Sequence, residues 1–174
     1  MIIHESYKSS IKLTDNGTVI KTLKSSEING EWLSAYNTLS QNDDRFVKIL
    51  KILSKTSYEM EYLTESFVSV EDLIKNPKNY GKLSKDDIIN ITALLPSLFV
   101  KTLELSKQLP QNRYFIHGDM LLPNFLFTES KKIKIIDPDG FCFVNNLDFV
   151  EKYYMSSINV MYNIQKVFYH KGSF

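Results

Sequence analysis

The sequence predicts an α+β fold in which an N-terminal part built from β-hairpins is followed by a mainly helical part. Up to about residue 63, short runs of alternating apolar and polar residues are separated by turn residues, which is typical of antiparallel strands. After that point, apolar residues recur at helical spacing behind serines that can cap helices. The 174 residues are 43% hydrophobic, which is enough for a core within a single domain over 1–174.

The first predicted hairpin has strands over residues 10–14 and 18–23. An Asn16-Gly17 pair lies between them, and Asn-Gly supplies the positive φ angles that tight hairpin turns need. The alternation places three side chains on one face of the second strand: Val19, Lys21 and Leu23.

A helix is predicted next, over residues 25–39, with Ser25 or Ser26 as its N-cap. Its apolar residues recur every three to four positions: Ile28, Trp32, Leu33, Tyr36 and Leu39. A second hairpin follows, with strands over 46–53 and 58–62.

Two serines in the second half of the chain have the spacing of a capping box. Ser69 lies three residues before Asp72, and Ser84 lies three residues before Asp87. The first spacing predicts the start of a short helix, and the second predicts a long helix over 85–109. A third helix is predicted over 147–170, ending near Gly172.

A short apolar hairpin with strands over 125–128 and 133–136 is predicted between the two long helices. Asn124 directly precedes its first strand and Asp137 directly follows its second, so closure of the hairpin brings these residues together. Asp119 lies five residues before Asn124, and a tight loop of that length lets both side chains face one cavity.

These residue types suit one kind of chemistry. Phosphoryl transfer needs a carboxylate beside the attacking hydroxyl and hard oxygen ligands that hold magnesium on the nucleotide phosphates. Asp119 suits the first role, and Asn124 and Asp137 suit the second. The sequence therefore predicts a magnesium-dependent phosphoryl-transfer site.

The segment 115–143 resembles the catalytic loop and metal-binding segment of the kinase-like phosphotransferases, especially the aminoglycoside phosphotransferase and choline kinase group. Gly118 favours that group, because eukaryotic-type protein kinases prefer arginine after the histidine. The resemblance implies a small protein-kinase-like fold. Residues 1–63 would form an antiparallel β-sheet lobe with one helix, and 64–174 a reduced, mainly helical catalytic lobe.

The resemblance also implies a nucleotide site in the first lobe. Lys21 would contact the ATP phosphates, with Lys24 as a nearby competitor, and Glu31 would pair with that lysine, with Glu27 as the alternative. Three residues would form the linker whose backbone meets the adenine ring: Glu61, Tyr62 and Leu63. The glycine-rich phosphate loop of the family is absent, because the corresponding turn at residues 5–10 contains serines instead.

For two acidic residues the sequence leaves two possible roles open. Asp139 is either a second acid near the metal or a turn residue, and Asp148 either supports the catalytic loop or is an ordinary residue of a helix start. Asp137 is followed by Pro-Asp-Gly where protein kinases have Phe-Gly, which argues against a regulated activation segment.

The resemblance implies transfer of the γ-phosphoryl group of ATP, with Mg²⁺, to a hydroxyl of a small molecule or sugar. Two alternatives stay open. An atypical protein kinase would share the three site residues, and a nucleotide-binding pseudokinase or regulatory module would explain the missing glycine loop and the short region after Gly140.

Composition limits the partners. The 21 basic and 20 acidic residues give no excess charge to attract nucleic acid or an anionic membrane. The most apolar stretch, 91–100, is too short to span a membrane. The single cysteine, Cys142, excludes an internal disulfide, is expected to pack beside Phe141 and Phe143, and is compatible with the cytoplasmic location that we expect.

Overall fold

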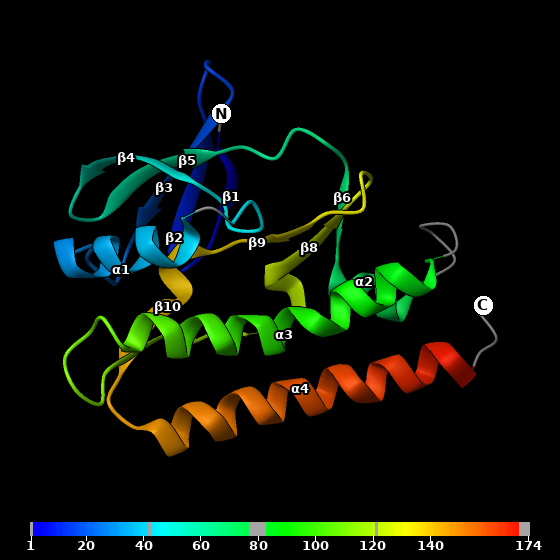
Figure 1. Cartoon of the computed structure of the whole chain (residues 1–174). Coiled ribbons are helices and arrows are strands. Elements are labelled where there is room, and N and C mark those ends of the chain that lie inside the picture. The colour runs from blue at the N-terminus through cyan, green and yellow to red at the C-terminus, as the bar shows by residue number, and fades with distance from the viewer. Residues whose placement is uncertain (1, 42, 77–82, 121, 171–174) are drawn as a thin grey trace. The chain divides into compact units, whose positions relative to one another are not determined.

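The computed structural model describes residues 2–41, 43–76, 83–120 and 122–170 (Figure 1). The chain divides into two compact units, Met1–Ser66 and Phe67–Phe174, and the division falls close to the predicted boundary after residue 63. The first unit contains an antiparallel β-sheet and one helix, and the second contains helices together with short strands. The predicted α+β class is therefore confirmed.

The first unit is built on a five-stranded antiparallel sheet with the strand order β1-β2-β3-β5-β4. Its strands are β1 (Ile2–Glu5), β2 (Ser9–Leu13), β3 (Thr18–Leu23), β4 (Ile49–Ser54) and β5 (Ser57–Glu61). Both predicted hairpins are confirmed, although β4 starts at Ile49 and not at Phe46. At the first turn, Gly17 has a positive φ of 73° and Asn16 does not, so the turn requires only its glycine to be left-handed.

The helix of the first unit, α1 (Gly30–Ser40), begins later than predicted. Its N-cap is Asn29, whose side chain accepts a hydrogen bond of 2.7 Å from the Trp32 N–H. The prediction of Ser25 or Ser26 is wrong, because the Ile28 N–H donates to the Lys55 carbonyl in the β4–β5 turn and keeps the preceding residues out of the helix.

Aromatic residues pack α1 against the segment that precedes β4. The Tyr36 ring is almost fully buried, its hydroxyl donates a 2.7 Å hydrogen bond to the Val47 carbonyl, and Phe46 packs edge-on against it. Tyr58 on β5 is also fully buried. The core of the first unit therefore contains large aromatic side chains whose polar ends are satisfied.

The second unit contains three helices and two small antiparallel sheets in its described residues. The helices are α2 (Val70–Lys75), α3 (Lys85–Ser106) and α4 (Leu147–His170), with single 3₁₀ turns at Leu122–Asn124 and Pro138–Gly140. One sheet has the order β6-β8-β9, and the other pairs β10 with β7. These strands are β6 (Phe67–Ser69), β7 (Tyr114–His117), β8 (Phe125–Thr128), β9 (Ile133–Ile135) and β10 (Phe141–Val144).

The predicted β8–β9 hairpin is confirmed, with Phe125 opposite Ile135. The sequence did not predict β6, β7 or β10, because segments of three or four residues are too short to show a period.

Both predicted caps are confirmed. Ser69 accepts from the Asp72 N–H at the start of α2, and Ser84 forms a complete capping box with Asp87 at the start of α3. The buried Asp87 carboxylate also receives a 2.9 Å hydrogen bond from Lys131, which ties the start of α3 to the β8–β9 turn. The helix ends at Ser106, slightly before the predicted 109.

Helices α3 and α4 pack side by side and run in opposite directions (Figure 1). Between them the buried Thr102 hydroxyl donates to the Phe115 carbonyl at 3.3 Å and shares a 2.9 Å hydrogen bond with the Tyr154 hydroxyl. Helix α4 spans the predicted residues, but its expected end near Gly172 lies outside the described residues.

Within the described ranges, α3 alone has the length and apolar composition of a membrane-spanning helix. A single such helix is weak evidence for a span, because the core helix of a globular protein has the same properties, and Leu94, Leu95 and Leu98 of α3 are core residues. The structure gives no indication of a protein that crosses a membrane several times within these ranges.

Candidate functional site

A buried histidine joins the two predicted parts of the site within the second unit. His117, at the end of β7, has no exposed surface. Its Nδ1 accepts a 3.2 Å hydrogen bond from the Asp119 N–H, and its Nε2 lies 3.3 Å from the Ile136 carbonyl. Because Nδ1 is the acceptor, Nε2 carries the proton and donates to that carbonyl. One neutral imidazole thus connects the loop that carries Asp119 to the segment that carries Asp137.

Asn124 is fixed to the same loop. Its side-chain Nδ2 donates a 2.8 Å hydrogen bond to the Asp119 carbonyl, which leaves Oδ1 as the atom of this amide that suits a metal ion. The Asn124 carbonyl accepts from the Ile136 N–H at 3.0 Å. The predicted convergence of Asn124 with the segment before Asp137 is therefore present in the backbone ladder.

Asp137 has a left-handed backbone, with φ 65° and ψ 59°. Asp and Asn adopt this conformation more readily than most residues. Residues with such uncommon backbone angles cluster at functional sites. It directs the chain into the 3₁₀ turn Pro138–Gly140, where the Gly140 N–H donates back to the Asp137 carbonyl at 2.8 Å.

Two glycines allow the backbones of the two segments to touch. The Gly118 N–H donates a 2.8 Å hydrogen bond to the Gly140 carbonyl. A Cβ atom at Gly140 would lie 2.7 Å from Cε1 of His117, and a Cβ atom at Gly118 would lie 2.9 Å from Sγ of Cys142. The close approach of the two backbones explains why both positions are occupied by glycine.

The electrostatics of His117 show which charges surround it. Burial lowers the pKa of His117 below its ordinary value, although the Ile136 carbonyl and the negative charges of Asp137, Asp119 and Asp139 act in the opposite direction. The imidazole therefore stays neutral at physiological pH, while three carboxylates interact with it. Asp139 belongs to this acidic group, whether or not it contacts a metal.

The described residues contain no group of three or more histidine, cysteine, aspartate or glutamate side chains that would hold a metal ion by themselves. Magnesium does not require such a cage, since it is commonly held by one or two carboxylates together with substrate phosphates and water. The half-buried side chains of Asn124 and Asp137 offer hard oxygen atoms of the type that magnesium prefers.

In the first unit, burial separates the two candidate lysines. Lys21 points to the buried face of β3 with Val19 and Leu23, as predicted, and is only 3% exposed. Lys24 is exposed, and its Nζ bonds to the Glu5 carboxylate at 3.0 Å and the Ser6 carbonyl at 2.8 Å. A buried ammonium is costly and marks a structurally demanding position, so Lys21 is the stronger candidate.

The two candidate glutamates also differ in position. Glu31 lies in the first turn of α1, whereas Glu27 lies before the helix in a segment without regular structure. Glu31 is therefore the acid that α1 itself positions. Its pairing with Lys21 stays a prediction.

The predicted linker residues occupy the end of β5. Glu61 is the last residue of that strand and accepts a 3.1 Å hydrogen bond from the Lys48 N–H, while Tyr62 and Leu63 follow the strand without regular structure. Tyr62 is 41% exposed. A role of this backbone toward adenine stays a prediction.

The turn between β1 and β2 uses its own amide groups. The Ser6 N–H donates to the Ser9 carbonyl, and the Ser6 hydroxyl accepts from the Lys8 and Ser9 N–H groups. These amides are engaged within the turn, in contrast to a phosphate-binding loop whose amides face the ligand.

One expectation for the second unit is corrected, and for Asp148 the structure agrees with the interpretation of an ordinary helix-start residue. Cys142 is exposed, because strand alternation turns it away from Phe141 and Phe143, whose rings pack against Phe115. Asp148 is exposed in the first turn of α4, and the cap of that helix is Asn146, whose Oδ1 accepts from the Phe149 N–H.

The residue of α4 that does contact the candidate loop is Tyr153, which sequence reasoning missed. Its hydroxyl accepts a 3.0 Å hydrogen bond from the Met120 N–H. A tyrosine on an amphipathic helix is usually a packing residue, so the sequence contained no signal for this contact with the loop.

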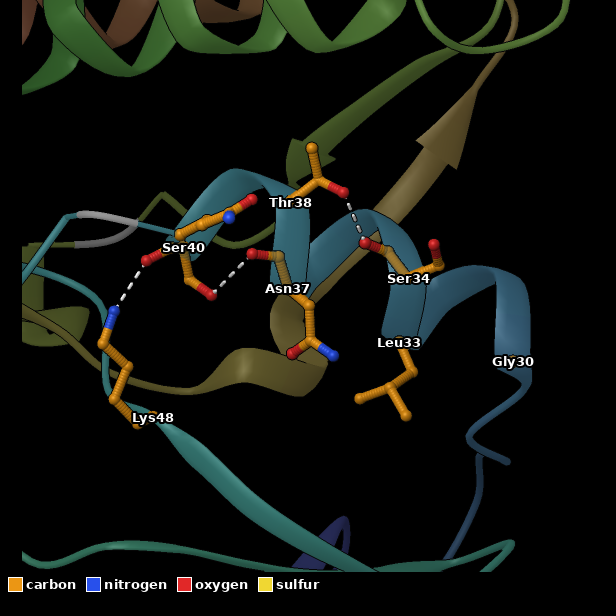
Figure 2. Close-up of a pocket in the computed structure, with 8 residues that line it drawn as sticks. Gly30, Leu33, Ser34, Asn37, Thr38, Ser40 and Lys48 are labelled. Carbon is orange, nitrogen blue, oxygen red and sulfur yellow. Dashed lines mark hydrogen bonds between the residues drawn. The ribbon is translucent and has the colours of Figure 1, made fainter.

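A separate hollow of about 630 Å³ lies beside α1 in the first unit (Figure 2). It is lined by Gly30, Leu33, Ser34, Asn37, Thr38, Ser40, Gln41 and Lys48. Lys48 Nζ is engaged by the Ser40 and Asp43 carbonyls, at 2.6 and 2.9 Å, so this cation stabilises the C-terminal end of α1. None of the predicted site residues lines this hollow.

The chain matches no protein-family model and no curated protein.

Proposed function

We propose that the protein is an ATP- and magnesium-dependent phosphotransferase of the kinase-like type, which moves the γ-phosphoryl group to a hydroxyl of a small molecule or sugar. The observation that supports this proposal best is the connection of Asp119, Asn124 and Ile136, the residue before Asp137, through His117 and the backbone of the second unit. Phosphoryl transfer depends mainly on such positioning and on charge stabilisation.

Each residue has a defined role in this proposal. Asp119, half-buried in the candidate catalytic loop, accepts or orients the proton of the attacking hydroxyl. Asn124 Oδ1 and the Asp137 carboxylate would hold the magnesium ion, which would supply positive charge to the nucleotide phosphates. Lys21 is the residue of the first unit proposed to contact the nucleotide phosphates. His117 stays neutral and holds the two segments together.

A nucleotide-binding pseudokinase is the second candidate, and the β1–β2 turn favours it. The N–H groups of Ser6, Lys8 and Ser9 are engaged within the turn, so this turn offers few donors to a triphosphate. In that case the chain would bind Mg·ATP through the second unit and transfer nothing.

Labelled ATP distinguishes the two functions. The wild-type protein is incubated with [γ-³²P]ATP, Mg²⁺ and pools of sugars, amino alcohols and other small alcohols, and label is followed into metabolites and into protein. Label in a metabolite supports the proposal, and label in an added protein substrate supports an atypical protein kinase. Binding of Mg·ATP without any transfer would leave the pseudokinase.

Two isosteric variants test the division of roles. Asp137→Asn should abolish the thermal stabilisation by Mg·ATP, which for the wild type at 100 times Kd amounts to about 2.7 kcal/mol. Asp119→Asn should retain that stabilisation and lose transfer, since a positioned base contributes about 10²–10⁴-fold in rate. Asp86→Asn, an exposed residue of α3, is the matched control. Equal loss of nucleotide binding in both site variants would contradict the assignment.

A further inference from the structure

The surroundings of Asp119 include one polar group that the proposed reaction has not used. The Tyr153 hydroxyl, on α4, accepts a 3.0 Å hydrogen bond from the N–H of Met120, the residue that follows Asp119. A side chain of one helix thereby holds the backbone of the candidate catalytic loop, which lies 33 residues away in sequence.

Helix α4 places this hydroxyl rigidly. Val150 and Tyr154, on the neighbouring positions of the helix, are fully or almost fully buried, and Tyr154 is bonded to Thr102 of α3. The Tyr153 ring stacks on Phe149, with 5.8 Å between ring centroids and 9° between planes. The anchored helix and the stacking favour the orientation in which the half-buried ring presents its hydroxyl to the loop.

The charge distribution supports the same arrangement. Burial raises the pKa of Tyr153, and the negative charge of Asp119 raises it further, against the effect of the Met120 N–H. The hydroxyl therefore keeps its proton and lies close enough to Asp119 to interact with its carboxylate. A tyrosine hydroxyl is both acceptor and donor, and among the described contacts it is used only as an acceptor.

We propose that Tyr153 is the positioning residue of this loop: its hydroxyl fixes the Met120 N–H and thereby holds Asp119 in the orientation needed for the acceptor hydroxyl. The inference rests on the proposed phosphotransferase function for its catalytic consequence, but not for its structural part. In this proposal the residue of α4 that supports the loop is Tyr153, and not Asp148, which was the candidate from sequence.

The test is Tyr153→Phe, which keeps the ring and its stacking and removes only the hydroxyl. The first readout is hydrogen exchange at the Met120 amide, which should be protected in the wild type and exchange about 3- to 10-fold faster in the variant, as expected for the loss of one hydrogen bond. Tyr162→Phe, the same substitution at an exposed site of α4, should leave the Met120 amide unchanged.

The second readout is kinetic. Tyr153→Phe should lower kcat about 3- to 10-fold while KM for ATP stays near the wild-type value, and the loss of one hydrogen bond should lower the unfolding midpoint only slightly. A purely structural tyrosine would lower the midpoint and would leave kcat unchanged.

The outcomes are distinguishable from failure of the proposed function. If the wild type transfers no label, the exchange measurement still decides whether Tyr153 holds the loop. An unprotected Met120 amide in the wild type, or equal protection in Tyr153→Phe, would overturn the inference, as would an unchanged kcat in an active enzyme. The wild-type exchange measurement also remains decisive if the variant does not fold.

Discussion

Replacement of Gly140 by alanine should disturb the contact on which the site depends. A Cβ atom at Gly140 would lie 2.7 Å from Cε1, 3.2 Å from Nδ1 and 3.3 Å from Nε2 of His117. Gly140 does not have a positive φ, so alanine is compatible with its backbone and the nearest obstacle is the imidazole. The ring has no exposed surface and is bonded through both nitrogens, so it cannot move aside without losing a contact.

The magnitude follows from these contacts. Overpacking of a filled interior costs about 1–3 kcal/mol, and loss of one of the two imidazole hydrogen bonds would add about 0.5–1.5 kcal/mol. We therefore expect Gly140→Ala to lower the free energy of unfolding of the second unit by about 1.5–4.5 kcal/mol. The Asp119 amide, which donates to Nδ1, should also lose protection from hydrogen exchange.

Urea unfolding followed by far-ultraviolet circular dichroism measures the stability. The only tryptophan, Trp32, lies in the first unit, so its fluorescence reports separately on the unit that does not carry the substitution. Gly30→Ala is the control, because no atom lies within 4 Å of its added Cβ. That substitution should be neutral or stabilise by up to about 1 kcal/mol.

A double substitution tests the cause. If the imidazole is the obstacle, Gly140→Ala should cost much less in a His117→Ala background than in the wild type, because the clash is gone. Wild-type stability of Gly140→Ala, or strict additivity with His117→Ala, would refute the reasoning.

Two further predictions concern buried polar groups. Because burial depresses the pKa of His117, the folded protein keeps it neutral while the unfolded chain binds a proton below about pH 6.5, so stability should fall as pH drops below that value, by up to about 1.4 kcal/mol per unit. Urea midpoints between pH 8 and 5 check this, and a flat profile would contradict it. Thr102→Val should cost about 1–3 kcal/mol, since it removes the hydrogen-bond partner of the buried Tyr154 hydroxyl. Tyr154→Phe should cost less, because the Thr102 hydroxyl keeps its hydrogen bond to the Phe115 carbonyl. Equal costs of the two substitutions would exclude this explanation.

The elements with a clear period were predicted well from sequence. The β2–β3 and β8–β9 hairpins and helix α4 lie close to their predicted bounds, since each has a strong apolar pattern or a turn residue with a specific conformation. The start of α1 was misplaced because a tertiary hydrogen bond, from Ile28 to Lys55, decides which of several possible caps is used. Such a bond leaves no local signal.

In the candidate site, too, the features set by local sequence were predicted and those set by tertiary contacts were not. The spacing of Asn124 and Asp137 around a hairpin predicted that their segments meet, because pairing of two adjacent strands is a local event. Tyr153 was missed and Cys142 was misjudged, because their surroundings depend on which face of α4 or β10 meets the loop. That choice is made by packing between distant segments and not by the residues themselves.

The central claim is that Asn124 and Asp137 hold the metal of a bound nucleotide, and paramagnetic broadening tests it most directly. Mn²⁺ replaces Mg²⁺ in a titration of the isotope-labelled protein with ATP, and the broadening of nuclear magnetic resonance signals falls steeply with distance from the ion. The account predicts the strongest broadening at the Asn124 side-chain amide and the Asp137 backbone amide, decreasing along the β8–β9 hairpin toward its turn at residues 129–132. Broadening centred elsewhere, or none that depends on ATP, would contradict it.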